Sequence, residues 1–111
     1  MPASILTQLA TTLSVDRKVI ANKLGISDRT LTRRLQPSAR LTPEESDRAV
    51  RLARVVARSI EVLGSPENAA DWLRTPHPVL EDRTPFEMLD TDAGVQLVET
   101  ILGRIAYGIY S

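Results

Sequence analysis

The side chains best suited to chemistry in this sequence are hydrogen-bond donors grouped between residues 23 and 40. Arg29, Thr32, Arg33 and Gln36 recur at helical spacing, which places them on one face of a helix. Such donors suit the base edges in the major groove of DNA, where arginine is the usual bidentate partner of guanine. Neighbouring residues are better placed to hold phosphates, which position a protein without reading sequence: Lys23, Ser27, Arg34 and Arg40. The sequence therefore predicts a DNA-binding surface.

A helix-turn-helix pattern surrounds these donors. Ala21 is small enough for a second helix to cross close to it, and Gly25 permits the sharp turn between the two helices. Ser27 is suited to cap the second helix. The residues expected to fill the space between the helices are Ile20, Leu24, Ile26 and Leu31, with Leu35 packing beside Leu31. The alternative is a helical hairpin that only resembles a DNA-binding unit. Because one unit offers little interface, we expect a homodimer on a two-fold symmetric site.

Opposite charges are segregated along the chain. Residues 1–58 carry eleven Lys or Arg against five Asp or Glu, and residues 59–111 carry three against nine, so a neutral total conceals halves at +6 and −6. The acidic half contains all four aromatic residues: Trp72, Phe86, Tyr107 and Tyr110. This contrast predicts a DNA-binding and dimerisation region at 1–58 and a protein-binding region at 59–111. A chain of 111 residues is about one domain, so the two regions are expected to share a core.

The periodicity of apolar residues is helical throughout, which predicts an all-α fold in which a long helix joins the helix-turn-helix to a small helical domain. Thr42-Pro43-Glu44-Glu45 combines an N-cap, a proline at the first helical position and a capping-box glutamate. Expected helices cover residues 4–13, 16–24, 28–36, 42–63, a short stretch around Trp72, a turn or two after residue 84, and 92–107; residues 74–83 form an ordered loop. On the long helix, a row formed by Arg51, Arg54 and Arg58 is typical of either a solvated face or a contact surface.

The sequence contains no group of residues that is typical of an enzyme active site. Cysteine is absent, and the single histidine, His77, lies between two prolines without a nucleophile or metal-ligand cluster at a suggestive spacing. The glycines are too scattered for a phosphate-cradling loop. We therefore expect a protein that is not an enzyme and has no metal or cofactor. Residues 1–12 contain no Lys or Arg and no apolar run approaches the ~20 residues of a membrane span, so we expect a soluble cytoplasmic protein without a membrane partner.

The final helix is apolar over a broader arc than one packing face needs, which indicates a partner surface. Two aromatic residues lie among the last five, where chain ends are normally polar. One reading is a tail that folds back onto the core. The other is a short segment that inserts into a second protein, since aromatic residues carry much of the energy at interfaces.

Taken together, these motifs closely resemble the Xre/MbcA/ParS family of type II antitoxins. The resemblance covers nearly the whole chain and is carried by four groups of residues: Gly25-Ile26-Ser27-Asp28-Arg29-Thr30-Leu31-Thr32-Arg33-Arg34; Leu41-Thr42-Pro43-Glu44-Glu45-Ser46-Asp47-Arg48; Trp72-Leu73-Arg74-Thr75-Pro76 with Leu80, Arg83-Thr84-Pro85 and Leu89; and Gly94, Val98, Leu102-Gly103-Arg104-Ile105 and Tyr107-Gly108. Many relatives carry a longer segment before the helix-turn-helix.

The resemblance implies a partner that composition alone does not supply, namely a RES-domain toxin that depletes cellular NAD. It implies that the amino-terminal region represses the operon by binding operator DNA. It also implies that the carboxyl-terminal region blocks the active site of the toxin. The implied toxin-binding residues are Arg104, Tyr107, Gly108, Ile109, Tyr110 and Ser111. The alternative is a plain helix-turn-helix regulator whose acidic half dimerises or binds another effector.

Overall fold

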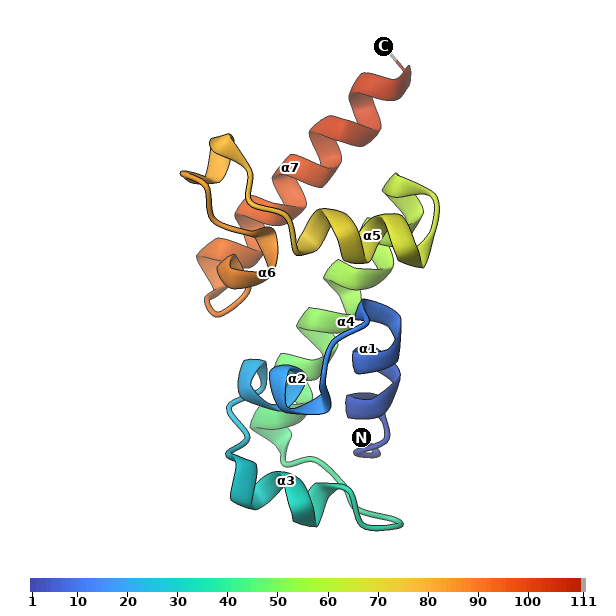
Figure 1. Cartoon of the computed structure of the whole chain (residues 1–111), viewed down its shortest axis with the longest axis vertical. Helices are drawn as coiled ribbons and strands as arrows, with labels where there is room; N and C mark the ends of the chain where they lie inside the picture. Colours follow the sequence, from blue (N-terminus) through green and yellow to red (C-terminus); the bar gives the residue numbers. More distant parts are fainter. Residues whose placement is uncertain (111) are drawn as a thin grey trace. The chain divides into compact units, whose positions relative to one another are not determined.

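The computed structural model describes residues 1–110 and the side chains of residues 1–108 (Figure 1). Over this range the regular elements are helices, which confirms the all-α prediction, and none of them is long and apolar enough to cross a membrane. Two compact units are present: one comprises Met1–Ala53 and the other begins at Arg54. The boundary falls inside the long helix α4 (Pro43–Leu63).

The first unit contains α1 (Ile5–Leu13), α2 (Arg17–Lys23), α3 (Asp28–Arg34) and the first half of α4. The cap of α2 is Asp16, whose side chain accepts a hydrogen bond from the backbone N–H of Lys18 at 3.1 Å. Gly25 ends the turn after α2 at a φ of 76°, the left-handed conformation that favours glycine. The side chains that form the core are Ala3, Leu6, Leu9, Ala10, Leu13, Ile20, Ala21, Leu24, Ile26, Leu31, Leu41, Ala49 and Leu52. This core holds the helix-turn-helix in place.

The connector between α3 and α4 is fastened to the first residues of the chain. The N–H of Ala3 donates to the carbonyl of Ala39 at 3.0 Å, and the N–H of Leu41 donates to the carbonyl of Met1 at 3.0 Å. Ala3 and Leu41 are both buried. Backbone pairing therefore orders a connector that has no helix of its own.

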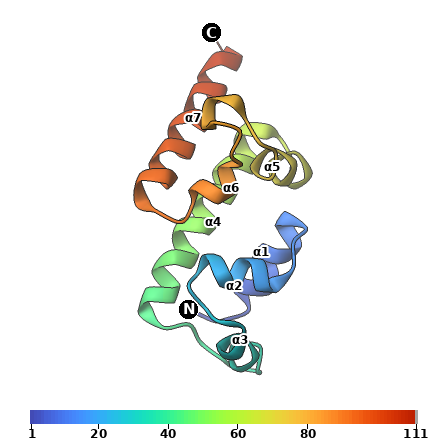
Figure 2. The ribbon, with the colours of Figure 1, turned by 60° about the vertical axis from the view of Figure 1, so that its left-hand side comes forward.

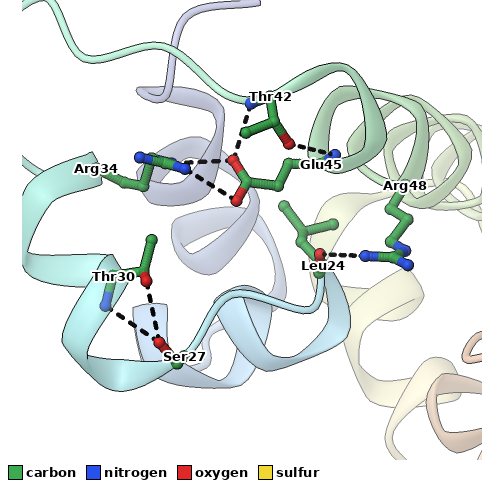
Figure 3. A network of polar contacts seen from close by, with 7 residues as sticks. All are labelled: Leu24, Ser27, Thr30, Arg34, Thr42, Glu45 and Arg48. Carbon is green, nitrogen blue, oxygen red and sulfur yellow. Dashed lines mark hydrogen bonds and ion pairs between the residues drawn. The ribbon is translucent and has the colours of Figure 1, made fainter.

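The start of α4 carries a polar network that holds the end of α3 (Figure 3). Glu45 completes the capping box, since its Oε1 accepts from the N–H of Thr42 at 2.9 Å while the hydroxyl of Thr42 accepts from the N–H of Glu45 at 3.1 Å. The same carboxylate receives Nε of Arg34 at 2.9 Å and Nη2 of Arg34 at 3.1 Å. The two hydrogen bonds from Arg34 are the main reason that the pKa of Glu45 lies below its usual range. One buried carboxylate thus joins two helices.

A second link connects α4 to the turn of the helix-turn-helix. Nη1 of Arg48 donates to the carbonyl oxygen of Leu24 at 3.1 Å, at the C-terminal end of α2 (Figure 3). This donor satisfies a carbonyl that the helix itself leaves unpaired. A Cβ at Gly25 would meet the same guanidinium, so the glycine also makes room for this contact.

The prediction that Leu35 packs beside Leu31 is wrong. Leu31 is buried, whereas Leu35 follows the end of α3 with 39% of its surface exposed. Arg34 turns towards the interior instead, with 18% of its side chain exposed. An arginine can do this because its aliphatic stem packs against apolar neighbours while its guanidinium binds Glu45. Accordingly α3 ends at Arg34, two residues earlier than predicted.

The second unit contains the rest of α4, then α5 (Pro66–Leu73), the 3₁₀ turn η1 (Pro78–Leu80), α6 (Pro85–Met88) and α7 (Asp92–Tyr110). Ser65 caps α5 and Thr84 caps α6, each by accepting a backbone N–H. Gly94 lies where α7 begins against the end of α6, and a Cβ there would overlap the carbonyl oxygen of Met88. The core residues are Val55, Val56, Ala69, Ala70, Leu73, Leu80, Leu89, Val95, Val98 and Leu102.

The final helix is longer than predicted. We expected α7 to end near Tyr107, with Gly108 as the stop, but the helix continues to Tyr110. Gly108 has no positive φ, so it continues the helix and does not terminate it. The last α7 residue with a buried side chain in the described part of the chain is Leu102. In both views the end of α7 extends past α5 and the loop around η1 (Figure 2).

Replacing Glu45 by Gln tests the network that holds α3. We expect Glu45→Gln to lower the free energy of unfolding by about 1–3 kcal/mol at neutral pH, because a charge-assisted pair with Arg34 is lost. Since the folded-state pKa of Glu45 is lowered, its stabilisation is complete above the unfolded pKa of about 4.3 and is lost as the pH falls through the folded value. Urea unfolding between pH 3 and pH 7 measures this difference. The exposed neighbour provides the control Glu44→Gln, and a pH-independent difference for Glu45→Gln would contradict the assignment.

Replacing Gly94 by Ala tests the contact between α6 and α7. The added methyl group has to displace the backbone at Met88, so we expect a loss of about 1–3 kcal/mol of stability. Thermal unfolding should show a lower Tm. The matched control is Gly103→Ala on the same helix, where a Cβ meets nothing and helix propensity improves by about 1 kcal/mol. Equal shifts in Tm for the two variants would show that the close approach has no energetic importance.

Candidate functional site

One face of α3 and the residues just beyond it present the predicted base-contacting side chains to solvent. Arg29, Thr32 and Arg33 are exposed on α3, and Gln36 is exposed just after the helix ends. Leu31 lies on the opposite side with 5% of its surface exposed. The helix therefore separates an apolar side that packs from a polar side that carries donors. Such a helix can present its donors to the edges of bases.

The residues predicted to contact phosphates occupy different environments. Ser27 is the N-cap of α3, where its hydroxyl accepts from the N–H of Thr30 at 3.2 Å and donates to the hydroxyl of Thr30 at 3.1 Å (Figure 3). Arg40 is exposed in the connector, and Lys23 is half-buried at the end of α2. Arg34 holds Glu45 with two of its nitrogens. This pairing gives Arg34 a structural role that the sequence did not indicate.

The predicted toxin-contacting residues from Arg104 to Tyr110 lie on the terminal turns of α7. Arg104, Tyr107 and Gly108 are exposed, and Tyr107 has 79% of its surface accessible. The side chains of Ile109 and Tyr110, and all of Ser111, lie outside the described residues. The half-buried Ile105 and Ala106 belong to the same turns. The described part of this segment is thus an exposed helix with few polar side chains.

The loop between α5 and α6 is built around Trp72 and His77. Nε2 of His77 lies 3.0 Å from the carbonyl oxygen of Trp72, and the two rings lie 5.3 Å apart between centroids. Trp72 is half-buried. The N–H of His77 also donates to the carbonyl of Arg83 at 3.1 Å, which closes the loop. Through these contacts His77 stabilises the loop. In the described part of the chain, no cluster of three potential metal ligands occurs.

Sequence reasoning missed the residues that fix the orientation of α3. Glu45 was recognised as a capping residue but not as the partner of Arg34, and Arg48 was not assigned a contact with the turn at Leu24. Arg34 was interpreted from the sequence as a phosphate contact and was not assigned a partner within the chain. In the second unit, the exposed Val79 also gave no signal before the fold was known.

Two family models match the chain, one in each part. Residues 1–54 match the antitoxin Xre-like helix-turn-helix domain. Residues 58–108 match the antitoxin Xre/MbcA/ParS C-terminal toxin-binding domain. The exposed face of α3 lies in the first match, and the exposed turns of α7 up to Gly108 lie in the second.

Several curated proteins are similar over most of their length. An Antitoxin Xre of Yersinia enterocolitica is 35% identical, over 88% of this chain and 67% of that protein. An Antitoxin Xre of Photorhabdus laumondii is 31% identical, over 100% of this chain and 76% of that protein. A Prs ADP-ribosylating antitoxin of a Sphingobium species is 30% identical, over 98% of this chain and 74% of that protein.

A solved structure has the same fold. A chain in the crystal structure of the M. tuberculosis MbcT–MbcA toxin–antitoxin complex matches 98% of this chain and 96% of its own length, with a TM-score of 0.69. Its 22% sequence identity supports a likeness in fold alone. From the family matches and the similar antitoxins, the chain belongs to the Xre/MbcA/ParS family of antitoxins, with a helix-turn-helix domain followed by a toxin-binding domain.

Proposed function

We propose that this protein binds and neutralises a RES-domain toxin that depletes NAD, and that it binds operator DNA to repress its own operon. The proposal rests on one observation, which is that the chain contains two different domains. The first is a helix-turn-helix domain whose hydrogen-bond donors face solvent, and the second is a toxin-binding domain that ends in an exposed helix. A plain regulator would need only the first of these. Family membership therefore favours the antitoxin over the regulator.

The protein would neutralise the toxin by occupying its active site. The last turns of α7 extend beyond Leu102, and Tyr107 offers an aromatic side chain that its own domain does not bury. Aromatic residues of this kind anchor many interfaces. With Arg104 and the residues after Gly108, Tyr107 would fill the active-site cleft of the toxin and exclude NAD. The antitoxin itself would act by binding and not by catalysis.

An NAD-consuming toxin agrees with the name of one similar protein. The Sphingobium relative is called a Prs ADP-ribosylating antitoxin. ADP-ribosylation takes its ADP-ribosyl group from NAD, so that name refers to chemistry at the same molecule. We infer that the toxin partner of this chain has NAD as its substrate.

Operator binding would place α3 in the major groove, with the protein acting as a homodimer in the cytoplasm. Arg29 and Arg33 would contact guanines, and Thr32 and Gln36 would contact neighbouring bases. The phosphate contacts would come from Lys23, Ser27 and Arg40. Arg34 would act mainly by fixing the helix through Glu45, with its remaining nitrogen available to a phosphate. The positive charge of residues 1–58 would supply the electrostatic attraction.

The DNA-binding proposal is tested by replacing both arginines on the exposed face of α3. Arg29→Ala with Arg33→Ala should weaken operator binding at least about tenfold, because each bidentate base contact is worth about 1–3 kcal/mol. Toxin binding should stay unchanged. A gel-shift titration at fixed salt, with the DNA upstream of the gene, measures the loss.

A matched control for this titration is Arg83→Ala, which removes an exposed arginine from the other unit. It should leave operator affinity nearly unchanged. If the Arg29/Arg33 variant bound the operator as tightly as the unchanged protein, the assignment of α3 as the recognition helix would be wrong.

The toxin proposal is tested in cells that express the RES-domain protein expected to be encoded beside this gene. The intact chain should restore growth and NAD content, and a version ending at Tyr107 should not, because the segment that fills the cleft is missing. Rescue by both versions would move the inhibitory contact to the helical body. Rescue by neither would contradict the antitoxin proposal and favour a plain regulator.

A further inference from the structure

An apolar groove lies on the second unit, away from the terminal turns of α7. We call it the Val79 groove. It has a volume of about 210 Å³ and is lined by Val79, Leu80, Glu81, Arg83, Met88 and Leu97. Its walls come from η1, the loop after it, α6 and the middle of α7. The groove thus joins segments that are separate in sequence.

Two large apolar side chains of this groove remain exposed to solvent. Val79 has 69% of its surface accessible and Leu97 has 41%. Their neighbours Leu80 and Val98 are buried, so the exposure does not arise from loose packing. Exposed apolar side chains that gather at one concave site are typical of an interaction surface.

The loop that presents Val79 is firmly held. The carbonyl of His77 accepts the N–H groups of Leu80 at 2.9 Å and Asp82 at 3.0 Å, and the N–H of Arg83 donates to Leu80 at 3.1 Å. Glu81 follows η1 in the left-handed region, with a φ of 57°.

This backbone conformation is unfavourable for the residues that adopt it. Glu81 and its neighbour Asp82, with a φ of 63°, are consecutive non-glycine residues in the left-handed region. Each costs of the order of 1 kcal/mol, and such strain is often found at sites that bind other molecules. The hydrogen bonds of the loop hold the side chain of Val79 exposed to solvent. The loop therefore loses little conformational entropy when a partner binds.

The helix that carries the proposed toxin-contacting residues, α7, also forms one wall of the Val79 groove through Leu97. Ile101 and Ile105 follow Leu97 at intervals of four residues on α7, and both are half-buried. From Leu97 to Tyr107 the helix rises by about 15 Å. One helix therefore connects the groove to the exposed terminal turns within the domain that matches the toxin-binding family.

We propose that the Val79 groove is a second contact for the toxin and that it holds an apolar toxin side chain surrounded by basic residues. This inference rests on the proposed antitoxin function. Four of the six lining residues are apolar and suit an apolar side chain, while Glu81 and Arg83 line the groove with opposite charges. The net charge of the surroundings is acidic, since Asp82 is exposed beside the groove and residues 59–111 carry a net charge of −6, and this favours basic residues on the toxin. The groove would supply affinity, whereas the end of α7 would supply inhibition.

The test is the affinity of purified variants for the RES-domain toxin. Val79→Asp should weaken binding at least about thirtyfold, because the new carboxylate would have to lose its hydration against the apolar toxin side chain. Leu97→Ser should weaken it by a smaller factor. Val50→Asp, a similar change at an exposed apolar residue of the other unit, should have no effect on toxin affinity. Circular dichroism and operator binding should be the same for all variants that fold.

Two further variants test the charge and the independence of the two contacts. Glu81→Lys should lower toxin affinity and make it less sensitive to salt. A chain ending at Tyr107 should still bind the toxin, and adding Val79→Asp to that truncation should weaken the remaining binding by the same factor as in the full chain, since separate contacts contribute additively.

The outcomes separate this inference from the function on which it rests. If the unchanged chain does not bind the toxin, the antitoxin proposal fails. If the unchanged chain binds and Val79→Asp binds equally well, only the second contact is refuted. If Val79→Asp changes the mass of the free protein in light scattering and leaves toxin affinity intact, the groove belongs to a second copy of this chain and the inference is overturned.

Discussion

The ion pair between Arg34 and Glu45 is the interaction on which the geometry of the helix-turn-helix domain depends. Glu45 has 9% of its surface exposed, and its two oxygens accept from Arg34 and from the backbone of Thr42. A partly buried carboxylate is stable there only while these donors are present. The same group therefore begins α4, closes the connector and holds the last turn of α3. With Arg48 bound to Leu24, α4 holds both the turn of the helix-turn-helix and the end of α3.

The toxin-binding domain is organised around α7 in a different way. One side of this helix is buried through Val95, Val98 and Leu102, and Gly94 allows its start to approach Met88 closely. Beyond Leu102 the helix has no buried side chain in the described residues. Its first half therefore stabilises the domain, while the described side chains after Leu102 are exposed or half-buried and suited to contact another protein. This division along one helix agrees with a domain whose family binds toxins.

Local signals in the sequence predicted most of the fold, because caps and turns are decided by neighbouring residues. Ser27, Thr42 and Gly25 all act as expected. The errors concern contacts between distant residues: Arg34 pairs with Glu45 eleven positions later, which leaves Leu35 exposed. The length of α7 was also misjudged, since glycine ends a helix only where it adopts a left-handed conformation. The Val79 groove could not be anticipated because its walls come together only in the fold.

The separation of roles on α3 bears on how such a protein can diverge. The residues that hold the helix, Leu31 and Arg34, are distinct from those that it presents, among them Arg29 and Arg33. Substitutions at the presented positions leave the packing of the helix unchanged, so they carry little cost in stability. The exposed donors of α3 can therefore change while the residues that hold the helix stay the same. One scaffold can in this way carry different sets of exposed side chains in different members of a family.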